Sequence, residues 1–439
     1  MASDAKTRRL DCGDTVDRIS NLPANLMDLI LKCLPLHDAA RMSILSKTWR
    51  DAWGMLSCLE FDDDFFYKLQ SKRIGMKYIE ILLSELSRTI SGILLTHSGP
   101  ILKFHISIPL GLPLHRQADM NFWIKNISRN GVRKLKIYNK AISACKIPSY
   151  LFSCLELTHL RLRNCILNPP LRFGGFCNLI SVRLVNVIIT TVMSFGTQLD
   201  ELDLEHCTGI EHLGCQFKYN NNLTVLSILK CGEIEWKWFE FTPKVENLCL
   251  VLNGEAKKIM DLDKLVDEMP NLHTLHFNGL LLKSLEPGAA VVNRATTMKK
   301  LKNLYLYDLA LCDLPQIQYV LCLIRISPNL QYLYVELNSK EESENGINLA
   351  ASMELKVLQY LQSPNLIDMM FNQLETVEIR GMVGSAELEF IKLLLASSPS
   401  LKWMKLLNPN IDDLEEAFRI SRELMRFPRA STAAQIIWT

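Results

Sequence analysis

One short pattern recurs along most of the chain and limits what the chain can fold into. Residues 157–167 read LTHLRLRNCIL, with leucine at the first, fourth and sixth places, cysteine at the ninth and an apolar residue at the eleventh. Similar segments begin at 132, 157, 179, 199, 223, 245, 272, 301, 330, 374 and 401, so the spacings are 25, 22, 20, 24, 22, 27, 29, 29, 44 and 27 residues. Most spacings lie in or near the roughly 20–29 residues of a unit that folds as one strand and one return segment. The repeat therefore predicts a solenoid whose short strands stack in parallel.

The single long spacing, 44 residues, contains a polar segment, NSKEESENGIN, which is followed by an expected helix from Leu349 to Leu361. We interpret this segment as an insertion into one repeat.

The ninth place of the repeat holds small polar residues, at the point where the chain leaves the strand. They are Cys165, Cys207, Cys231, Asn253 and Asn338. The spacing of the cysteines argues against a role as metal ligands, because the 13 cysteines include no Cys-x-x-Cys pair. The pattern therefore predicts structural side chains that hydrogen-bond the backbone at each turn.

Side chains at the third, fifth and seventh places of each strand are expected on the concave face of the solenoid, because Cβ direction alternates along a strand. The early strands place basic residues there, the next strand places Glu201, Asp203 and Glu205, and the late strands place aromatic residues. The candidate substrate-binding residues are Lys134, Lys136, Arg161, Arg163, Arg183, Tyr305, Tyr307, Tyr332, Tyr334 and Trp403. Exposed tyrosine and tryptophan are common anchors of binding sites, which suggests that acidic groups of a partner meet the early strands and an apolar segment meets the late ones. The alternative is an ordinary solvated face.

Residues 17–53 predict a separate module of three short helices. The first helix starts at Leu22-Pro23, since proline is tolerated in a first helical turn, and it stops at Leu34-Pro35. His37-Asp38 is expected to cap the second helix and Ser46 the third. Helices this short do not bury their apolar faces on each other alone, so the surplus apolar surface points to a partner.

This module resembles the F-box, which docks proteins onto the Skp-type adaptor of a cullin-based ubiquitin ligase. The matching positions are Leu22, Pro23, Leu29, Ile30, Leu34, Pro35, Ala40, Arg41, Ser43, Leu45, Ser46, Trp49, Arg50 and Trp53. Ala24 and Thr48 depart from the usual residues. The resemblance implies that the adaptor-binding residues are Leu22, Pro23, Leu26, Leu29, Ile30, Leu34, Pro35, Leu45 and Trp49. The alternative is that the module only caps a larger fold.

The repeats and the C-terminal part resemble those of plant F-box/FBD/leucine-rich-repeat proteins. In the C-terminal part, LETVEIRGMVGSAELEFIKLLLASSPSLKWMKL predicts a strand, a turn at Gly381 and Gly384, a helix from Ala386 to Ala396 and a strand at Leu401. A closing helix from Asp413 to Met425 and an edge strand in AAQIIW are also expected. A solenoid needs its terminal core covered, so this region is either a cap or a dedicated binding element.

The resulting fold class is α/β, with an N-terminal three-helix F-box, a parallel-stranded leucine-rich-repeat solenoid and an FBD-like cap. The expected boundaries are a flexible tail at 1–16, the F-box at 17–56, a helical linker at 57–97, the solenoid at 98–363 and the FBD region at 364–439. Within these, 98–108 is the expected first strand, followed by a helix from Asp119 to Asn130, and an amphipathic segment from Met76 to Leu86 lies in the linker.

The composition of the chain limits the compartment and the kinds of partner that we expect for it. The N-terminus has no apolar core of a signal peptide, and no uncharged apolar run approaches the ~20 residues of a membrane-spanning helix. A net charge of +2 argues against a general nucleic-acid binder. We therefore expect a soluble cytoplasmic or nuclear protein with no cofactor, no membrane partner and no nucleic-acid partner.

Catalytic constellations are missing from the sequence. There is no Gly-rich phosphate loop, no Gly-x-Ser-x-Gly elbow and no His-Glu-x-x-His. His273 and His276, three apart on a strand, are expected to point to opposite faces, and the run from Asp62 to Asp64 is interpreted as a solvated turn rather than a metal site.

The resemblance implies a non-catalytic, substrate-recognition subunit of an SCF-type (Skp-cullin-F-box) ubiquitin ligase. Its expected partners are the Skp-type adaptor, through it the cullin and RING subunits, and an unknown protein substrate. Two alternatives remain open, a scaffold outside any ligase and a small-ligand-dependent receptor.

Overall fold

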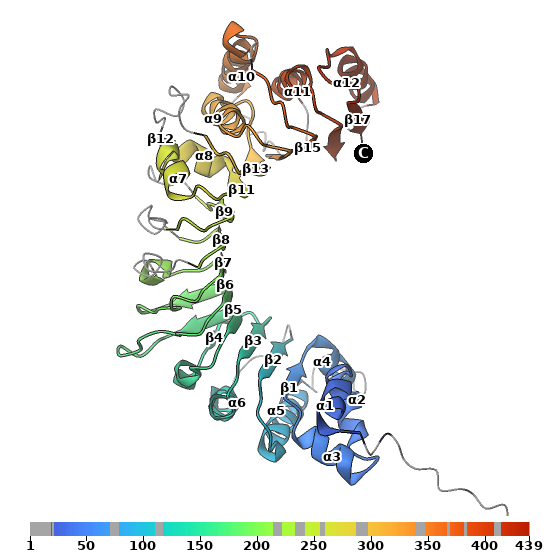
Figure 1. Ribbon diagram of the computed structural model, residues 1–439, viewed down its shortest axis with the longest axis vertical. Coiled ribbons are helices and arrows are strands. Elements are labelled where there is room, and N and C mark those ends of the chain that lie inside the picture. The colour runs from blue at the N-terminus through green and yellow to red at the C-terminus, as the bar shows by residue number, and fades with distance from the viewer. Residues whose placement is uncertain are drawn as a thin grey trace, which may run out of the picture. The chain divides into compact units, whose positions relative to one another are not determined.

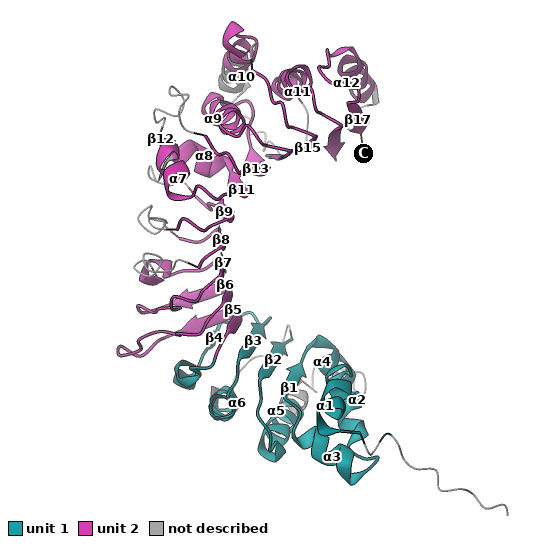
Figure 2. Cartoon of the chain, in the orientation of Figure 1, with its two compact units in different colours: residues 1–156 teal, residues 157–439 magenta. Residues whose placement is uncertain are grey.

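The computed structural model describes residues 19, 22–70, 79–109, 117–213, 222–232, 242–254, 260–286, 297–338, 347–366, 369–381, 384–407 and 414–438. The chain divides into two compact units, Met1–Glu156 and Leu157–Thr439 (Figure 2). The expected tail at 1–16 and most of the polar segment at 338–348 lie outside the described residues.

Unit 1 begins with the three expected short helices, α1 (Ala24–Lys32), α2 (Leu36–Met42) and α3 (Lys47–Gly54). Ser46 caps α3 as expected, because its Oγ accepts a hydrogen bond from Trp49 N at 3.2 Å. The expected cap of α2 by His37-Asp38 is wrong. Pro35 is the residue before this helix, and its φ of −54° and ψ of 143° direct the chain into the first turn without a side-chain cap.

The rest of unit 1 is a parallel sheet with helices in its connections (Figure 1). Strands β1 (Cys58–Phe61), β2 (Lys103–Ile108) and β3 (Lys134–Asn139) pair in that order. The first strand therefore lies within the expected helical linker and precedes the one expected at 98–108. Helices α4 (Asp63–Gln70), α5 (Ile79–Thr96) and α6 (Gln117–Arg129), the short strand β4 (Cys145–Lys146) and the 3₁₀ turn η2 (Ser149–Ser153) complete the unit.

Unit 2 contains the predicted stack of parallel strands. In spatial order they are β5 (His159–Leu167), β6 (Ser181–Ile189), β7 (Glu201–Glu205), β8 (Val225–Leu229), β9 (Asn247–Val251), β11 (Thr274–Asn278), β13 (Asn303–Leu309), β14 (Tyr332–Leu337), β15 (Thr376–Arg380), β16 (Trp403–Leu407) and β17 (Gln435–Trp438). Each strand pairs in parallel with the next, and residues at the same place of the repeat face each other across the pair. The predicted edge strand is thus β17.

Helices of unit 2 lie in the return segments, on the side of the strands away from the inner curve (Figure 1). They are α7 (Leu262–Glu268), α8 (Gly279–Ser284), α9 (Leu314–Arg325), α10 (Ile347–Leu361), α11 (Ser385–Ser397) and α12 (Leu414–Arg426). The turns η3 (Ile210–Leu213) and η7 (Pro364–Leu366) and the small pair β10 (Met260–Asp261) and β12 (Leu285–Glu286) complete the unit. The three helices expected after 348 are therefore present, with ends shifted by one or two residues. In the described part of the chain, no helix combines the length and the apolar character needed to cross a bilayer.

The core of unit 2 follows from the alternation of side chains along each strand. Leu202 and Leu204 of β7 are buried, and so are Leu304 and Leu306 of β13, at the same places of their repeats. The residues between them are only half-buried or exposed and lie on the opposite face of the sheet. This face is the one that the sequence predicts as the candidate substrate surface.

The ninth-place cysteines bond the backbone as predicted. The thiol of Cys207 donates to Leu184 O at 3.3 Å, and its backbone N donates to Cys231 Sγ at 3.3 Å. The thiols of Cys165 and Cys231 donate to carbonyl oxygens two residues earlier. The bonds of Cys207 therefore join consecutive repeats just past the ends of the strands, in addition to the pairing within the sheet.

Candidate functional site

The first candidate surface lies on the three N-terminal helices of unit 1. Helix α1 has apolar side chains on two faces: Met27 and Leu31 are buried against the other helices, whereas Leu26, Leu29 and Ile30 are exposed. Large side chains on one face of α1 are therefore exposed and not covered by the part of the chain that the structure describes. This is the apolar surplus that the sequence predicts.

The turn between α2 and α3 adds to this surface. Ile44 and Leu45 are 78% and 68% exposed. The sequence prediction included Leu45 but missed Ile44, although its place next to Leu45 before the Ser46 cap was a signal. Trp49 was expected to contact the adaptor, but its side chain is only 1% exposed. It lies in the core and supports the helices from within. Of the remaining predicted residues, Pro23 and Pro35 are exposed and Leu22 and Leu34 are half-buried.

The position of α1 is fixed by a contact with the strand that follows the helices. Asp28 on α1 accepts hydrogen bonds from the backbone N and the hydroxyl of Ser57, each at 3.4 Å. Ser57 immediately precedes β1, so the exposed residues of α1 are held relative to the sheet of unit 1.

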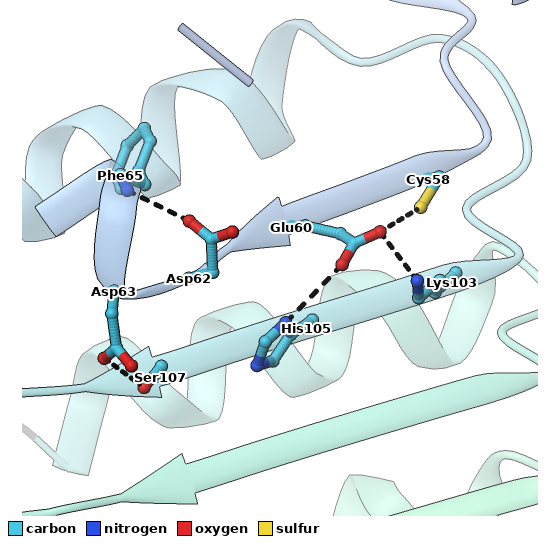
Figure 3. A network of polar contacts seen from close by, with 8 residues as sticks. All are labelled: Cys58, Glu60, Asp62, Asp63, Phe65, Lys103, His105 and Ser107. Atoms are coloured by element: carbon cyan, nitrogen blue, oxygen red, sulfur yellow. Dashed lines mark hydrogen bonds and ion pairs between the residues drawn. The ribbon is translucent and has the colours of Figure 1, made fainter. Parts of the chain in front are cut away.

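A polar network covers the face of β1 and β2 (Figure 3). Glu60 Oε1 accepts hydrogen bonds from Lys103 Nζ at 2.6 Å and from the Cys58 thiol at 3.2 Å, and His105 Nδ1 lies 3.6 Å from Glu60 Oε2. Burial raises the pKa of Cys58 to about 12, with a further contribution from Glu60, so this thiol stays protonated. Burial and Lys136 together lower the pKa of His105 below its ordinary value. The group is a structural network that pairs the Glu60 carboxylate, and it leaves the buried His105 Nε2 without a hydrogen-bond partner among the described residues.

The aspartates that follow β1 begin a helix, which corrects the expected solvated turn. Asp62 Oδ1 accepts a hydrogen bond from Phe65 N at 3.0 Å and so caps α4. Asp63 accepts hydrogen bonds from Lys140 Nζ at 2.6 Å and from Ser107 Oγ at 2.8 Å (Figure 3 draws the second). The hydrogen bond from Lys140 holds the pKa of Asp63 below its ordinary value. Among the described residues, no three His, Cys, Asp or Glu side chains come together as a metal site would require.

The predicted basic patch does not form one free surface. Lys134 and Lys136 belong to β3 of unit 1, where the Lys136 ammonium lies 4.3 Å from the centre of the Tyr138 ring. In unit 2, Arg161 and Arg163 are exposed. Arg183, however, pairs with the acidic strand beside it, with Nε 3.2 Å from Asp203 Oδ2 and Nη2 3.9 Å from Glu205 Oε2. Two cations of the patch, Arg161 and Arg163, therefore remain for a ligand of unit 2.

The late strands bring the predicted tyrosines together with a histidine that the sequence analysis did not assign to the site. We call this group the tyrosine platform; it consists of His276, Tyr305, Tyr307, Tyr332 and Tyr334. The His276 ring stacks on Tyr305 with ring centres 4.2 Å apart and an angle of 1°, and its Nδ1 shares a hydrogen bond with the Tyr307 hydroxyl at 3.1 Å. Tyr305 lies 5.3 Å from Tyr332 and 6.0 Å from Tyr334, and Tyr307 lies 5.8 Å from Tyr334. The rings are in mutual contact and form one continuous aromatic surface.

The platform carries no net charge of its own. Burial lowers the pKa of His276 to about 4, so the imidazole is neutral at pH 7. Burial raises the pKa of Tyr307 to about 12, and burial and a hydrogen bond with Glu378 raise that of Tyr332. At the edge of the platform, Lys405 Nζ lies 2.6 Å from Glu378 Oε1. Trp403, another predicted substrate-binding residue, lies two strands beyond Tyr332, and its side chain is 39% exposed. The rings of the platform are thus neutral and amphipathic. Two carboxylates lie beside them: Glu378, which pairs with Lys405, and Glu336, whose Oε2 accepts a hydrogen bond from the Tyr334 hydroxyl at 3.4 Å.

His276 lies at the same place of its repeat as Tyr305 and Tyr334, and the strand register sets these three side by side. This shared place was a signal in the sequence. His273, its expected counterpart on the opposite face, lies just before β11.

Comparison with known proteins assigns these features to a family. An F-box domain model matches residues 19–61, and a model of the leucine-rich repeats of the FBD-associated F-box protein At5g56370 matches residues 120–335. The F-box/FBD/LRR-repeat protein At1g13570 of Arabidopsis thaliana is 28% identical over 97% of this chain and 99% of that protein. The FBD-associated F-box protein At1g66310 of the same plant is 25% identical over 98% of each chain.

Among solved structures, an internalin of Listeria monocytogenes covers 80% of this chain and 94% of its own, with 11% identity and a TM-score of 0.35. That score bears on neither fold nor function.

A three-helix N-terminal module that matches the F-box, followed by parallel-stranded repeats, defines an F-box protein of the leucine-rich-repeat class. With relatives of this kind matching over nearly its whole length, the chain belongs to the F-box/FBD/LRR-repeat proteins of plants. These domains support an adaptor role, in which the F-box implies a Skp-type partner.

Proposed function

We propose that this chain is the substrate-recognition subunit of an SCF-type ubiquitin ligase. In this proposal, the F-box helices bind a Skp-type adaptor, which connects the chain to the cullin and RING subunits, and unit 2 binds the protein to be ubiquitinated. The chain supplies proximity and orientation, while the chemistry belongs to the recruited enzymes.

The observation that carries the proposal is the exposed apolar surface on the segment that matches the F-box. Leu26, Leu29, Ile30, Ile44 and Leu45 are all exposed on α1 and on the turn between α2 and α3. Fully burying one such side chain contributes about 1.5–3 kcal/mol, so this surface can supply the driving force for a stable complex. Part of this gain is offset by the freedom that both proteins lose on association.

Binding of a purified plant Skp-type adaptor to the full chain tests the first part. Leu45→Asp and Ile44→Asp should each weaken binding by about 10-fold or more, because a charge would be buried without a partner. Ile142→Asp is the matched control, since Ile142 is 96% exposed in unit 1 but lies far along the chain from the F-box. Adaptor binding that is undetectable for the wild type, or equal in all three variants, would refute the ligase proposal.

The tyrosine platform is the proposed substrate site, with Arg161 and Arg163 as a second contact for acidic groups. Tyrosine offers large, rigid contact area with a hydroxyl that can bond a partner, and little side-chain freedom is lost on binding. Because the platform is neutral, the matching part of the substrate is an apolar segment with few charges.

Proximity labelling in plant cells, with the proteasome inhibited, should identify proteins that depend on this site. Tyr334→Ala and Arg161→Glu should reduce the labelling of true substrates, whereas Tyr67→Ala and Arg172→Glu, exposed residues outside the site, should not. Labelling that Tyr334→Ala and Arg161→Glu leave unchanged would place the substrate site elsewhere. If labelling depended on the platform but the wild-type chain bound no adaptor, the result would instead support the scaffold alternative.

A further inference from the structure

The outermost helix of unit 2, α12, carries a surface that capping alone does not explain. The inward face of α12 is apolar, and its Ile420 and Leu424 are buried. On the outward face, Phe418 and Met425 are 70% and 75% exposed. A terminal repeat that only covers the core of a solenoid is expected to have a polar outer face. Two large apolar side chains in solvent therefore point to a further use of this helix.

The spacing of these two residues places them on one line along the helix. Seven residues make two turns, so Phe418 and Met425 lie about 10 Å apart on nearly the same side. Arg422, three residues before Met425 and four after Phe418, lies between them on that side, and Arg426 lies next to it. The exposed face of α12 thus carries two apolar anchors with Arg422 and Arg426 between and beside them, and the exposed Glu415 lies one turn before Phe418 on the same side.

Two cations of this stripe have no ion-pair partner among the residues that the structure describes. Arg419 pairs with Glu423, with Nη1 3.4 Å from Oε2. Arg422 and Arg426 are exposed, and neither makes an ion pair with any residue that the structure describes. The neighbouring strands differ, because Lys402 and Lys405 pair with Glu375 and Glu378 at 2.7 and 2.6 Å. The charge of the stripe is therefore available to an anionic partner.

We propose that the outward face of α12 is a second docking surface, which binds an acidic amphipathic peptide segment of another protein. Two apolar side chains of that segment contact Phe418 and Met425, and its carboxylates pair with Arg422 and Arg426. Such helix-against-helix recognition uses anchors at intervals of three, four and seven residues. A lipid surface fits less well, because two apolar side chains on a helix whose other face is packed offer little area for insertion.

The surface is independent of the F-box and of the tyrosine platform. It lies on a helix of unit 2 that begins after the last platform residue, and its residues belong to no group described above. A ligase subunit with such a surface would hold a third protein, or a second segment of its substrate, at the C-terminal end of the repeats.

Peptide display on the intact chain tests the proposal. A library of random 16-residue peptides is selected on the full chain and counter-selected on the variant Phe418→Ser with Met425→Ser. We expect the enriched peptides to be acidic and to carry apolar residues seven places apart. In fluorescence anisotropy, Arg422→Glu and Phe418→Ser should each weaken their binding by about 10-fold or more, and binding should weaken as salt is raised.

Matched controls separate this result from loss of folding. Leu355→Ser and Lys356→Glu change exposed residues of the same kinds on α10, and they should leave the affinity within about 2-fold. Adaptor binding should be unchanged in every α12 variant, which distinguishes this surface from the F-box. A selected peptide with lysine in place of its glutamates should bind the variant Arg422→Glu with Arg426→Glu more tightly than it binds the wild type.

Three outcomes would overturn the proposal. The first is that no peptide is enriched relative to the counter-selected variant. The second is enrichment of neutral or basic peptides whose binding ignores Arg422. The third is sedimentation of the chain with phosphatidylserine-containing vesicles that depends on Phe418, without any peptide binding, which would assign the stripe to a membrane surface.

Discussion

At the scale of single residues, the eighth place of the repeat is a position where backbone geometry selects the side chain. Non-glycine residues there adopt left-handed φ values of 50° to 54°: Asn164, Asn186, His206, Lys230 and Asp308. This conformation aims the backbone N–H at the next repeat, as when His206 N donates to Leu229 O at 2.8 Å and Lys230 N donates to Val251 O at 2.6 Å. Asparagine and aspartate tolerate it best, which explains their frequency at this place.

Lys230 is the least suited of these residues to its backbone. A left-handed backbone costs most L-residues roughly 1–2 kcal/mol, and glycine avoids this cost. Glycine also gives the unfolded chain more conformational freedom, which destabilises the folded state by about 0.5–1 kcal/mol. Lys230→Gly should therefore raise the free energy of unfolding by the difference, about 0.5–1 kcal/mol. Lys230→Val should lower it. Urea unfolding of the full chain measures both, with Lys244→Gly and Lys244→Val, at an exposed turn residue, as controls. A Lys230→Gly midpoint below that of the wild type would contradict this explanation.

His276 makes the tyrosine platform sensitive to acid. Burial lowers the pKa of His276 from 6.5 to about 4 in the folded chain. Between these values the unfolded state binds a proton that the folded state excludes, so this contribution to stability is complete above pH 6.5 and is lost as the pH falls toward 4. The unfolding midpoint of the wild type should therefore fall more steeply over this range than that of His276→Gln. Parallel curves for the two proteins would show that His276 does not titrate in this way.

Single residues also show where the sequence analysis of the site was sufficient and where it was not. The alternation of a strand is local, so it placed Tyr305, Tyr307, Tyr332 and Tyr334 on one face correctly. Charge pairing is not local, because it depends on which residues of neighbouring strands face each other. The sequence predicted Arg183 as a cation available to a substrate, but the strand register places it beside Asp203 of the next strand, and the two form an ion pair. Trp49 matched the F-box pattern, but a match in sequence does not distinguish a residue that supports a surface from one that forms it.

At the scale of elements, the long periodic segments were predictable and the short irregular ones were not. The strands of the long sheet from β5 to β16, without the separate pair β10 and β12, follow the repeat because each buries the same places against its neighbours. β1 was missed because it has only four residues, CLEF, and the interval to its partner β2 is far longer than the roughly 20–29 residues of one repeat. The cap of α2 was misassigned because a proline and a polar pair both qualify as helix starts in sequence.

Helix α3 offers a direct test of how one element supports the adaptor surface. Ser46→Ala removes the hydrogen bond from Trp49 N and should lower the free energy of unfolding by about 1 kcal/mol. Because Ile44 and Leu45 lie just before this cap, adaptor binding should also weaken by a few fold. Ser46→Asp keeps an acceptor at this place and should restore both quantities. Weak adaptor binding by Ser46→Asp, with normal stability, would mean that the serine contacts the adaptor itself.

At the scale of the whole molecule, stability is expected to be local because each repeat contacts mainly its sequence neighbours. Leu59 of β1 and Leu304 of β13 are both fully buried, the first in unit 1 and the second in unit 2. Replacing a buried leucine with alanine costs about 2–5 kcal/mol, through lost burial and the cavity that remains. The two substitutions are therefore matched in chemistry and differ in which unit they weaken.

Leu304→Ala should raise hydrogen exchange in β11, β13 and β14 while adaptor affinity stays within about 2-fold of the wild type. Leu59→Ala should do the reverse, loosening β1, β2 and the F-box helices and weakening the adaptor complex, while exchange in β13 and β14 is unchanged. Hydrogen exchange by mass spectrometry on the full chain, with adaptor titration of each variant, measures both effects. If Leu304→Ala weakened the adaptor complex as strongly as Leu59→Ala does, the chain would unfold as one cooperative body, and the local account of its stability would be wrong.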